Sequence, residues 1–275
     1  MRMVWLIAVA AAVILIWLFL LFPEKPTGQQ REPFEGRAFA HRGLYERDQS
    51  VPENSLPAFR RAVEAGYGAE LDVQLTKDHQ IVVFHDNDLK RACGQEGEIC
   101  DFTYDELQAF PLFQTEERIP LFSEVLDIFS GSQPLIVELK HCRNQKELCE
   151  ATRDMLKGYR GPACIESFDP SIVRYFRKYD SGRLRGQLSQ PYSDYCGVMP
   201  GWLGWLLSRT LFNAMARPHF IAYKLDSKPL SVRICESLGA MKVCWTARDA
   251  EKHDKLMREN DAVIFERYCP PVRRT

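Results

Sequence analysis

The clearest pattern in the chain is an uninterrupted apolar run near its start. Residues Met3 to Phe22 contain no charged or strongly polar side chain, and at helical rise about 20 such residues span the roughly 30 Å hydrocarbon core of a bilayer. A cleaved signal peptide has a shorter apolar region followed by a small-residue cleavage site, whereas this run continues into large residues and Pro23. We therefore expect residues 1–22 to form one retained transmembrane helix. A buried soluble helix is the other alternative, and the flanking charges are too balanced to predict the side of the membrane.

The next segment, Pro23 to Pro33, has a different character. It is rich in Pro, Gln, Gly and alternating charge, and it shows no apolar periodicity. Such a composition predicts a tether. The expected organisation is a transmembrane helix over 1–22, a linker over 23–33 and one globular domain over 34–275.

Within the domain, short apolar runs alternate with amphipathic stretches. The runs predict strands at Arg37–His41, Ala69–Leu75, Leu135–Lys140, Ala163–Phe168, Leu184–Leu188, Phe220–Lys224, Lys242–Thr246 and Ala262–Glu266. The stretches between them predict helices after a cap at Asn54 and at Leu121–Phe129, Lys146–Leu156, Pro170–Tyr179, Ser231–Leu238 and Ala250–Glu259. This alternation predicts the α/β class and a closed (β/α)₈ TIM barrel, whose active site would lie at the carboxyl ends of the strands.

One further strand-like run, Ile81–Asp86, interrupts this alternation. The turn before it is too short for a parallel crossover, which needs a dozen or more residues. We therefore expect a hairpin that places His85 on the same rim as Glu70 and Asp72. Residues 87–120 would then form a small insertion beside the site.

Charge and cysteine usage narrow the class of protein. The 36 Lys and Arg residues are matched by 37 Asp and Glu residues, so there is no basic excess to neutralise a phosphate backbone and we expect no nucleic-acid partner. The nine Cys residues include no CxxC metal pair and predict mainly buried thiols. Only Cys93 with Cys100, and Cys142 with Cys149, are close enough in sequence to suggest a disulfide in an oxidising compartment.

Acidic residues in the predicted strands indicate a metal site. Glu70 and Asp72 are two positions apart, so their side chains point to the same face. Neighbouring carboxylates inside a barrel are costly unless a cation compensates them, and a hard divalent cation such as Mg²⁺ or Ca²⁺ prefers oxygen ligands. Glu138 in the next apolar strand is the natural third ligand. The alternative is that these acids form buried salt bridges with Lys140 and Arg42.

Two histidines at strand ends suit phosphodiester hydrolysis. That reaction needs one group to take a proton from the attacking hydroxyl and another to give one to the leaving oxygen, and imidazoles titrate in the range that suits both roles. His41 and His85 are the candidates, and Arg42 can hold the non-bridging oxygens bidentately. A single histidine at a strand end is more often structural. Two histidines with two acids on one rim favour catalysis.

The same residues carry a resemblance to a known family over about residues 37–270. The matching motifs are Ala40-His-Arg-Gly43, Pro52-Glu-Asn-Ser55, Glu70-Leu-Asp-Val73, Val82-Val-Phe-His-Asp86, Val137-Glu-Leu-Lys140, Ser167-Phe168 and Trp245-Thr246. With these motifs the chain strongly resembles the glycerophosphodiester phosphodiesterase family, as a membrane-anchored member of bacterial type.

The resemblance implies a TIM barrel with a small insertion after the second strand. It also implies hydrolysis of glycerophosphodiesters to glycerol 3-phosphate and an alcohol, with a divalent cation. Attack by the glycerol hydroxyl, giving a cyclic phosphate, and direct attack by water both stay open. By position, the implied roles are catalysis by His41 and His85, metal binding by Glu70, Asp72 and Glu138, and substrate binding by Arg42, Glu53, Lys140 and Trp245.

Two features depart from the family pattern or extend it. The last predicted strand ends in Phe-Glu266 where relatives more often have Thr-Asp, so the role of this position stays open. The segment Gly201–Met215, which we call the lip, carries Trp202 and Trp205 and is unusually apolar. An ordinary barrel helix with a core face is one interpretation. The other is a surface that dips into the membrane interface and favours a lysophospholipid or another membrane-derived diester.

Three functional classes follow from the sequence. The first is a metal-dependent glycerophosphodiesterase. The second is a related phospholipase of the lysophospholipase D type, and the third is a catalytically silent domain that binds head groups. The retained histidines and carboxylates favour an enzyme over a silent domain.

Overall fold

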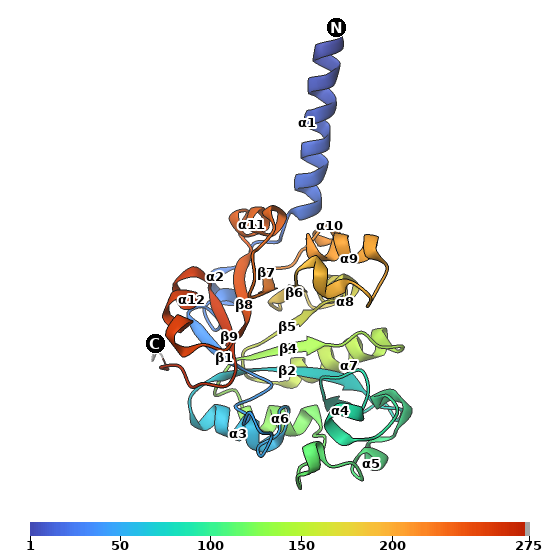
Figure 1. The fold of residues 1–275 in the computed structure, drawn as a ribbon, viewed down its shortest axis with the longest axis vertical. Coiled ribbons are helices and arrows are strands. Elements are labelled where there is room, and N and C mark those ends of the chain that lie inside the picture. Colours follow the sequence, from blue (N-terminus) through green and yellow to red (C-terminus); the bar gives the residue numbers. More distant parts are fainter. Residues whose placement is uncertain (273–275) are drawn as a thin grey trace.

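Eight parallel strands close into a barrel in the computed structural model, which describes residues 1–272. The strands lie in the order β1-β9-β8-β7-β6-β5-β4-β2, and pairing of β1 with β2 completes the ring (Figure 1). Their bounds are β1 Arg37–His41, β2 Gly68–Leu75, β4 Leu135–Leu139, β5 Ala163–Ser167, β6 Arg185–Ser189, β7 Phe220–Lys224, β8 Met241–Ala247 and β9 Ala262–Phe265. The predicted TIM barrel is confirmed.

Helices surround the barrel, and all of them except α9 and α10, which lie in the lip, follow the predicted positions to within a few residues. They are α3 Leu56–Glu64, α6 Phe122–Phe129, α7 Gln145–Gly158, α8 Pro170–Tyr179, α9 Gly201–Ser208, α10 Asn213–Ala216, α11 Leu230–Ser237 and α12 His253–Glu259. The predicted cap of the first of these helices was wrong. Ser55, and not Asn54, caps α3 by accepting a hydrogen bond from the backbone N–H of Ala58.

The barrel interior has an apolar floor beneath a polar layer. Alternation along β2 turns Leu71 and Val73 outward into the helix-packed core and leaves Glu70 and Asp72 for the interior. The floor contains Phe34, Phe39, Ile136, Leu184, Phe220 and Met241. A Cβ on Gly186 would lie 1.9 Å from the Phe220 ring, so glycine is required there for the ring to fill the floor.

The hairpin predicted for the strand-like run after β2 is confirmed. β3 (Ile81–Val83) pairs antiparallel with β2, with Val83 opposite Val73. The amide of Gln74 donates to the backbone carbonyls of Phe84 and Asp86 and so holds the chain on both sides of His85. Residues 87–120, which contain α4 (Lys90–Cys93) and α5 (Tyr104–Leu107), pack around a small core of their own.

The N-terminal helix α1 (Arg2–Leu21) projects from one end of the domain (Figure 1). Its mean hydropathy is 3.0 and 6% of its most apolar window is buried, so by length and composition it could cross a membrane. A signal sequence near the N-terminus would satisfy the same test.

The segment expected to be a tether packs against the barrel. It contains the short helix α2 (Gly28–Arg31). The side chain of Thr27 accepts a hydrogen bond from the backbone N–H of Gln30, and the side chain of Gln30 accepts one from the backbone N–H of Thr27. The carboxylate of Glu24 lies 2.5 Å from the guanidinium of Arg185, which is fully buried. All nine cysteines are free in the structure, including the two pairs considered for disulfides.

Candidate active site

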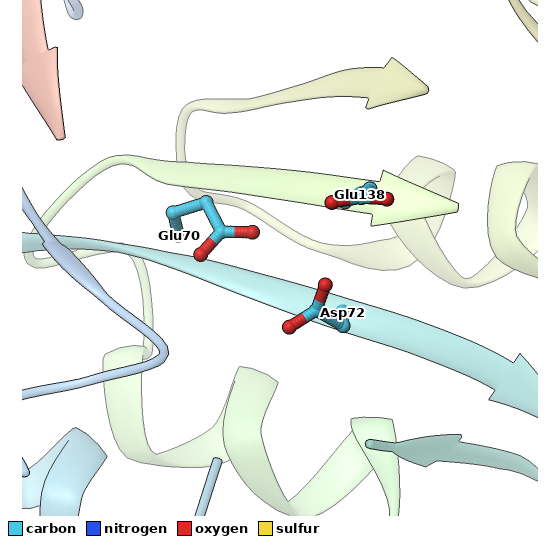
Figure 2. A group of neighbouring side chains, drawn as sticks. All are labelled: Glu70, Asp72 and Glu138. Atoms are coloured by element: carbon cyan, nitrogen blue, oxygen red, sulfur yellow. The ribbon is translucent and has the colours of Figure 1, made fainter. Parts of the chain in front are cut away.

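The strands bring three carboxylates together inside the barrel (Figure 2). Glu70 and Asp72 come from β2, and Glu138 lies opposite Asp72 on the neighbouring strand β4. Each offers an oxygen atom within 4.8 Å of the other two, and all three side chains are buried. The three predicted metal-binding residues therefore form one cluster.

The charges around this cluster are unevenly compensated. Burial raises the pKa of Glu70 well above its usual value, and the charges of Asp72 and Glu138 raise it further. Burial also raises the pKa of Glu138. Burial opposes ionisation of Asp72 too, but Lys140 and other neighbouring cations lower its pKa well below the usual value. Raised pKa values at two of three neighbouring carboxylates indicate that negative charge is in excess here.

Lys140 supplies part of the missing positive charge. Its ammonium lies 2.7 Å from a carboxylate oxygen of Asp72 and 2.8 Å from one of Glu138. The salt-bridge alternative is therefore realised for these two acids, but Glu70 makes no contact with the Lys140 ammonium. Glu166 on β5, opposite Glu138, adds a fourth buried carboxylate, and burial raises its pKa well above the usual value. A divalent cation bound by oxygen ligands fits this donor set and its excess of negative charge.

His41 ends β1 and is held by the residue that directly follows the last strand of the barrel, β9. Its Nδ1 lies 2.7 Å from the carboxylate of Glu266, which also accepts a hydrogen bond from Tyr45. Burial lowers the pKa of His41, and the charge of Arg42 lowers it further against the opposing effect of Glu266. An imidazole that donates from Nδ1 to a carboxylate and is neutral near pH 7 has Nε2 free to accept a proton.

Sequence reasoning did not find the role of Glu266 as the partner of His41. The sequence signal was present, because this position departs from the family pattern. Burial alone would raise the pKa of Glu266, but its hydrogen bond with His41 and the hydrogen bonds from Arg248 and Tyr45 keep it below the usual value. Glu266 is therefore a carboxylate anion.

His85 has a matching carboxylate partner. Its Nδ1 lies 2.7 Å from Asp86, and the guanidinium of Arg91 also binds Asp86. His85 and His41 both line one cavity of 760 Å³ at the carboxyl ends of the strands. The hairpin thus brings the two predicted catalytic residues to one site.

Arg42 links several of the acidic residues. Its backbone N–H donates to Glu70 and its guanidinium donates to Glu53, 2.7 Å away. Glu53 also binds Arg91 and does not line the cavity, unlike the other residues predicted to bind substrate. The side-chain amide of Asn54 donates to Asp72, which explains why Asn54 is not the helix cap.

The remaining wall of the cavity is mainly apolar. Trp245 donates its indole N–H to the backbone carbonyl of Ala222 and packs edge-to-face against Phe168. The segment between β6 and β7 adds Val198, Met199, Leu203, Leu207 and Phe212 to the lining. The lip therefore contributes three apolar side chains to the cavity wall, whereas the insertion after β2 contributes Asn87.

Comparison with known proteins identifies the family. The sequence model of the glycerophosphoryl diester phosphodiesterase family matches residues 41–268. A glycerophosphodiester phosphodiesterase of Caldanaerobacter subterraneus is 33% identical over 239 residues, which cover 82% of this chain and 91% of the relative. A lysophospholipase D of Rattus norvegicus is 32% identical over 52% of this chain and 48% of its own length.

Solved structures show the same fold. The glycerophosphodiester phosphodiesterase of Thermotoga maritima superimposes with a TM-score of 0.62 at 27% identity, over 83% of this chain and 93% of the other. A phosphodiesterase of Oleispira antarctica, solved with its product sn-glycerol-3-phosphate, gives a TM-score of 0.66 at 23% identity, over 83% of this chain and 92% of the other. By the extent of the family match and the relative covered almost throughout, this chain belongs to the glycerophosphoryl diester phosphodiesterase family.

Proposed function

We propose that the barrel hydrolyses glycerophosphodiesters to glycerol 3-phosphate and an alcohol, with a divalent cation held by Glu70, Asp72 and Glu138. The observation that carries this proposal is that the two carboxylate-held histidines line one cavity together with Glu70 and Glu138, two members of the carboxylate cluster. A cation bound there would stabilise negative charge that develops on the phosphate oxygens. Magnesium and calcium both accept an all-oxygen ligand set.

His41 is proposed as the general base. Its Nε2 accepts the proton of the attacking hydroxyl, either that of the substrate glycerol or that of water, as the new bond to phosphorus forms. The carboxylate of Glu266 stabilises the imidazolium that results, because it accepts the hydrogen bond from Nδ1. The lowered pKa of His41 keeps the imidazole neutral and ready to accept a proton.

His85 is proposed as the general acid. It gives a proton to the alcohol oxygen as the second phosphorus–oxygen bond breaks, and Asp86 holds its ring in position. Arg42 and Lys140, both in the cavity wall, would bind the non-bridging phosphate oxygens. Glu53 would act on the substrate through Arg42, which it holds by an ion pair.

The test is hydrolysis of a panel of glycerophosphodiesters by the purified chain. We expect glycerol 3-phosphate and the free alcohol as products, and loss of activity in chelator that either Mg²⁺ or Ca²⁺ restores. His41→Ala should lower kcat by a factor of about 10² to 10⁴, the usual contribution of general-base catalysis. His79→Ala, at an exposed histidine outside the cavity, is the matched control. Full activity in chelator, or in His41→Ala, would contradict the mechanism.

A second activity, of the lysophospholipase D type, is supported by one observation beyond the shared chemistry. The cavity that contains His41 and His85 has a largely apolar lining, part of which comes from the lip. A glycerophosphodiester without an acyl chain has no large apolar group that this wall could bury away from water.

We also propose that α1 is retained as a membrane anchor. Three observations support this proposal: the length of the helix, its mean hydropathy of 3.0 and the way its last turn packs on the domain. Asn213 donates its side-chain amide to the carbonyl of Leu21, and Arg217 donates to the carbonyls of Phe19 and Phe22. A signal sequence removed after translocation would leave these contacts without a partner.

A further inference from the structure

The lip presents two different surfaces. Leu203, Leu207 and Phe212 line the cavity that contains the catalytic residues. On the outside, Trp202 and Trp205 are 65% and 45% exposed. A soluble domain gains nothing from exposing two tryptophans on an eight-residue helix whose inner side is also apolar. The outer surface therefore suits an apolar or interfacial environment.

The chemistry of the outer surface matches the headgroup level of a bilayer. Tryptophan favours this level because its ring is apolar and its N–H is polar. The guanidinium of Arg209 stacks on Trp205 at 4.4 Å from the ring centroid. An arginine beside a tryptophan can reach lipid phosphates while its stem stays on the apolar surface.

The end of α1 is attached to the lip itself. Phe212 lines the cavity, and the next residue, Asn213, donates a hydrogen bond to the carbonyl of Leu21 at the end of α1. Arg217, two residues after the end of the lip, stacks on Phe19 and Phe22. The anchor, the lip and the cavity wall are thus joined within a few residues, and α9, α10 and α11 form the end of the domain from which α1 projects (Figure 1). When α1 crosses a bilayer, that end faces the membrane surface.

We propose that the lip is an interfacial entrance to the active site and that its inner side chains bind the acyl chain of a monoacyl glycerophosphodiester, a lysophospholipid. This proposal rests on the glycerophosphodiesterase function proposed above and names its substrate class. The outer tryptophans lie at the headgroup level, and the chain passes between the lip and Trp245 while the phosphate reaches Arg42 and Lys140. One acyl chain leaves a glycerol hydroxyl free, as in the chain-free substrate.

The reaction is the same hydrolysis applied to a larger substrate. An oxygen nucleophile forms a bond to phosphorus, and the bond from phosphorus to the head-group alcohol breaks. The proton taken from the nucleophile by His41 is balanced by the proton that His85 gives to the alcohol. The net co-reactant is one water molecule, and the products are a monoacylglycerol phosphate and the free alcohol.

The experiment uses the full chain reconstituted in liposomes of ether-linked phosphatidylglycerol and measures choline release from three substrates. These are lysophosphatidylcholine in the liposomes, diacyl phosphatidylcholine in the liposomes and glycerophosphocholine in solution. We expect kcat/KM for lysophosphatidylcholine to exceed that for glycerophosphocholine by about tenfold or more, because the acyl chain of the lysolipid buries apolar surface when it binds.

Two variants separate the inner and outer surfaces of the lip. Leu203→Asp should lower the ratio of kcat/KM for lysophosphatidylcholine to kcat/KM for glycerophosphocholine by roughly tenfold, since it puts a charge where the acyl chain lies. Leu203→Ser gives the same readout if the aspartate variant does not fold. Trp202→Ala with Trp205→Ala should slow lysophosphatidylcholine hydrolysis by about threefold or more and leave glycerophosphocholine hydrolysis unchanged. Tyr179→Ala, an exposed aromatic of α8, is the matched control.

The outcomes distinguish the two proposals. Release of choline from none of the substrates, with no hydrolysis of any glycerophosphodiester in the panel described above, would overturn the proposed function itself. Efficient hydrolysis of glycerophosphocholine, with no preference for the lysolipid and no change of the ratio in any lip variant, would overturn the interfacial entrance alone. Faster hydrolysis of the diacyl lipid than of the lysolipid would overturn the assignment of a single-chain substrate.

Discussion

At the scale of single residues, the site depends on how its carboxylates are shared among cations and imidazoles. Asp72 receives hydrogen bonds or ionic contacts from Asn54, Lys140 and Arg42, and it is the carboxylate of the cluster whose pKa is lowered. Glu70 is contacted by a backbone N–H and lies 3.9 Å from the Nε2 of His41. Asp72 therefore has compensation within the chain, whereas in the proposed metal site Glu70 would depend most on the bound cation.

Glu266 should affect catalysis through His41. In Glu266→Gln the imidazole loses the carboxylate that orients it and stabilises its protonated form, and we expect kcat to fall by roughly tenfold or more. Because Glu266 raises the pKa of His41, its loss should lower that pKa, and the acid limb of the kcat/KM profile should move to lower pH. The measurement is a pH–rate profile beside that of the wild-type protein.

A matched substitution checks that this effect is local. Glu236→Gln removes a carboxylate that is also buried and ion-paired, with Lys228, but lies outside the cavity. It should leave the acid limb where it is. An unchanged kcat and an unmoved acid limb in Glu266→Gln would show that His41 does not depend on this carboxylate.

At the scale of elements, the segment between α1 and the barrel is part of the folded domain. Glu24 accepts a hydrogen bond from Arg185, whose side chain is 0% exposed, and the backbone N–H of Glu24 donates to the carbonyl of Pro218. His219 lies beside this ion pair, and burial followed by the charge of Arg185 lowers its pKa to about 4. A neutral His219 leaves Glu24 as the carboxylate partner of the buried arginine.

Removing this contact should destabilise the barrel. We expect Glu24→Ala to lower the free energy of unfolding of residues 23–275 by about 1–3 kcal/mol, because it leaves a buried guanidinium without its carboxylate. The expected loss is below that of a fully buried pair because the Glu24 side chain is 45% exposed. Urea denaturation measures the difference.

Two comparisons make this result specific. Glu32→Ala, at an exposed acid of the same segment, should change stability little. A chain that begins at residue 34 should be no more stable than Glu24→Ala. Equal stability of residues 34–275 and 23–275 would restore the interpretation of this segment as a simple linker.

At the scale of the whole molecule, the orientation of the domain depends on whether α1 is kept. The helix ends at Leu21, whose side chain is 0% exposed, so the domain and the helix are joined through buried contacts as well as through the chain. This arrangement places α9 and α10, the helices of the lip, at the end of the domain that carries the anchor (Figure 1). In the interfacial entrance proposed above, a membrane-derived substrate would reach the site along this surface.

The anchor gives a prediction about the intact protein. We expect the chain to stay with membranes after washing at high salt and alkaline pH, because about 20 apolar residues hold it there, and its intact mass to include residues 1–22. Ile7→Arg together with Ile14→Arg places two charges in the apolar run and should release the protein, whereas leucine at both positions should not. A soluble protein whose mass begins after residue 22 would identify the run as a cleaved signal sequence.

The sequence alone determined the barrel and the membership of the carboxylate cluster. Period-two and helical patterns are local, so the strands and most helices were predicted close to their observed bounds. Glu70 and Asp72 share a face by geometry alone, and the short turn before β3 required a hairpin. These features could be predicted because they depend on residues that are close together in the sequence.

Only the tertiary structure decided which distant side chains complete the site. Glu266 reaches His41 because β9 pairs with β1 when the barrel closes, and Glu24 reaches Arg185 across 161 positions of the chain. Asn54 suited a helix cap in the sequence, but the nearby carboxylate of Asp72 takes its amide. Long-range contacts such as these depend on the order and register of the strands. Both are set when the whole barrel closes, so no local sequence pattern predicts them.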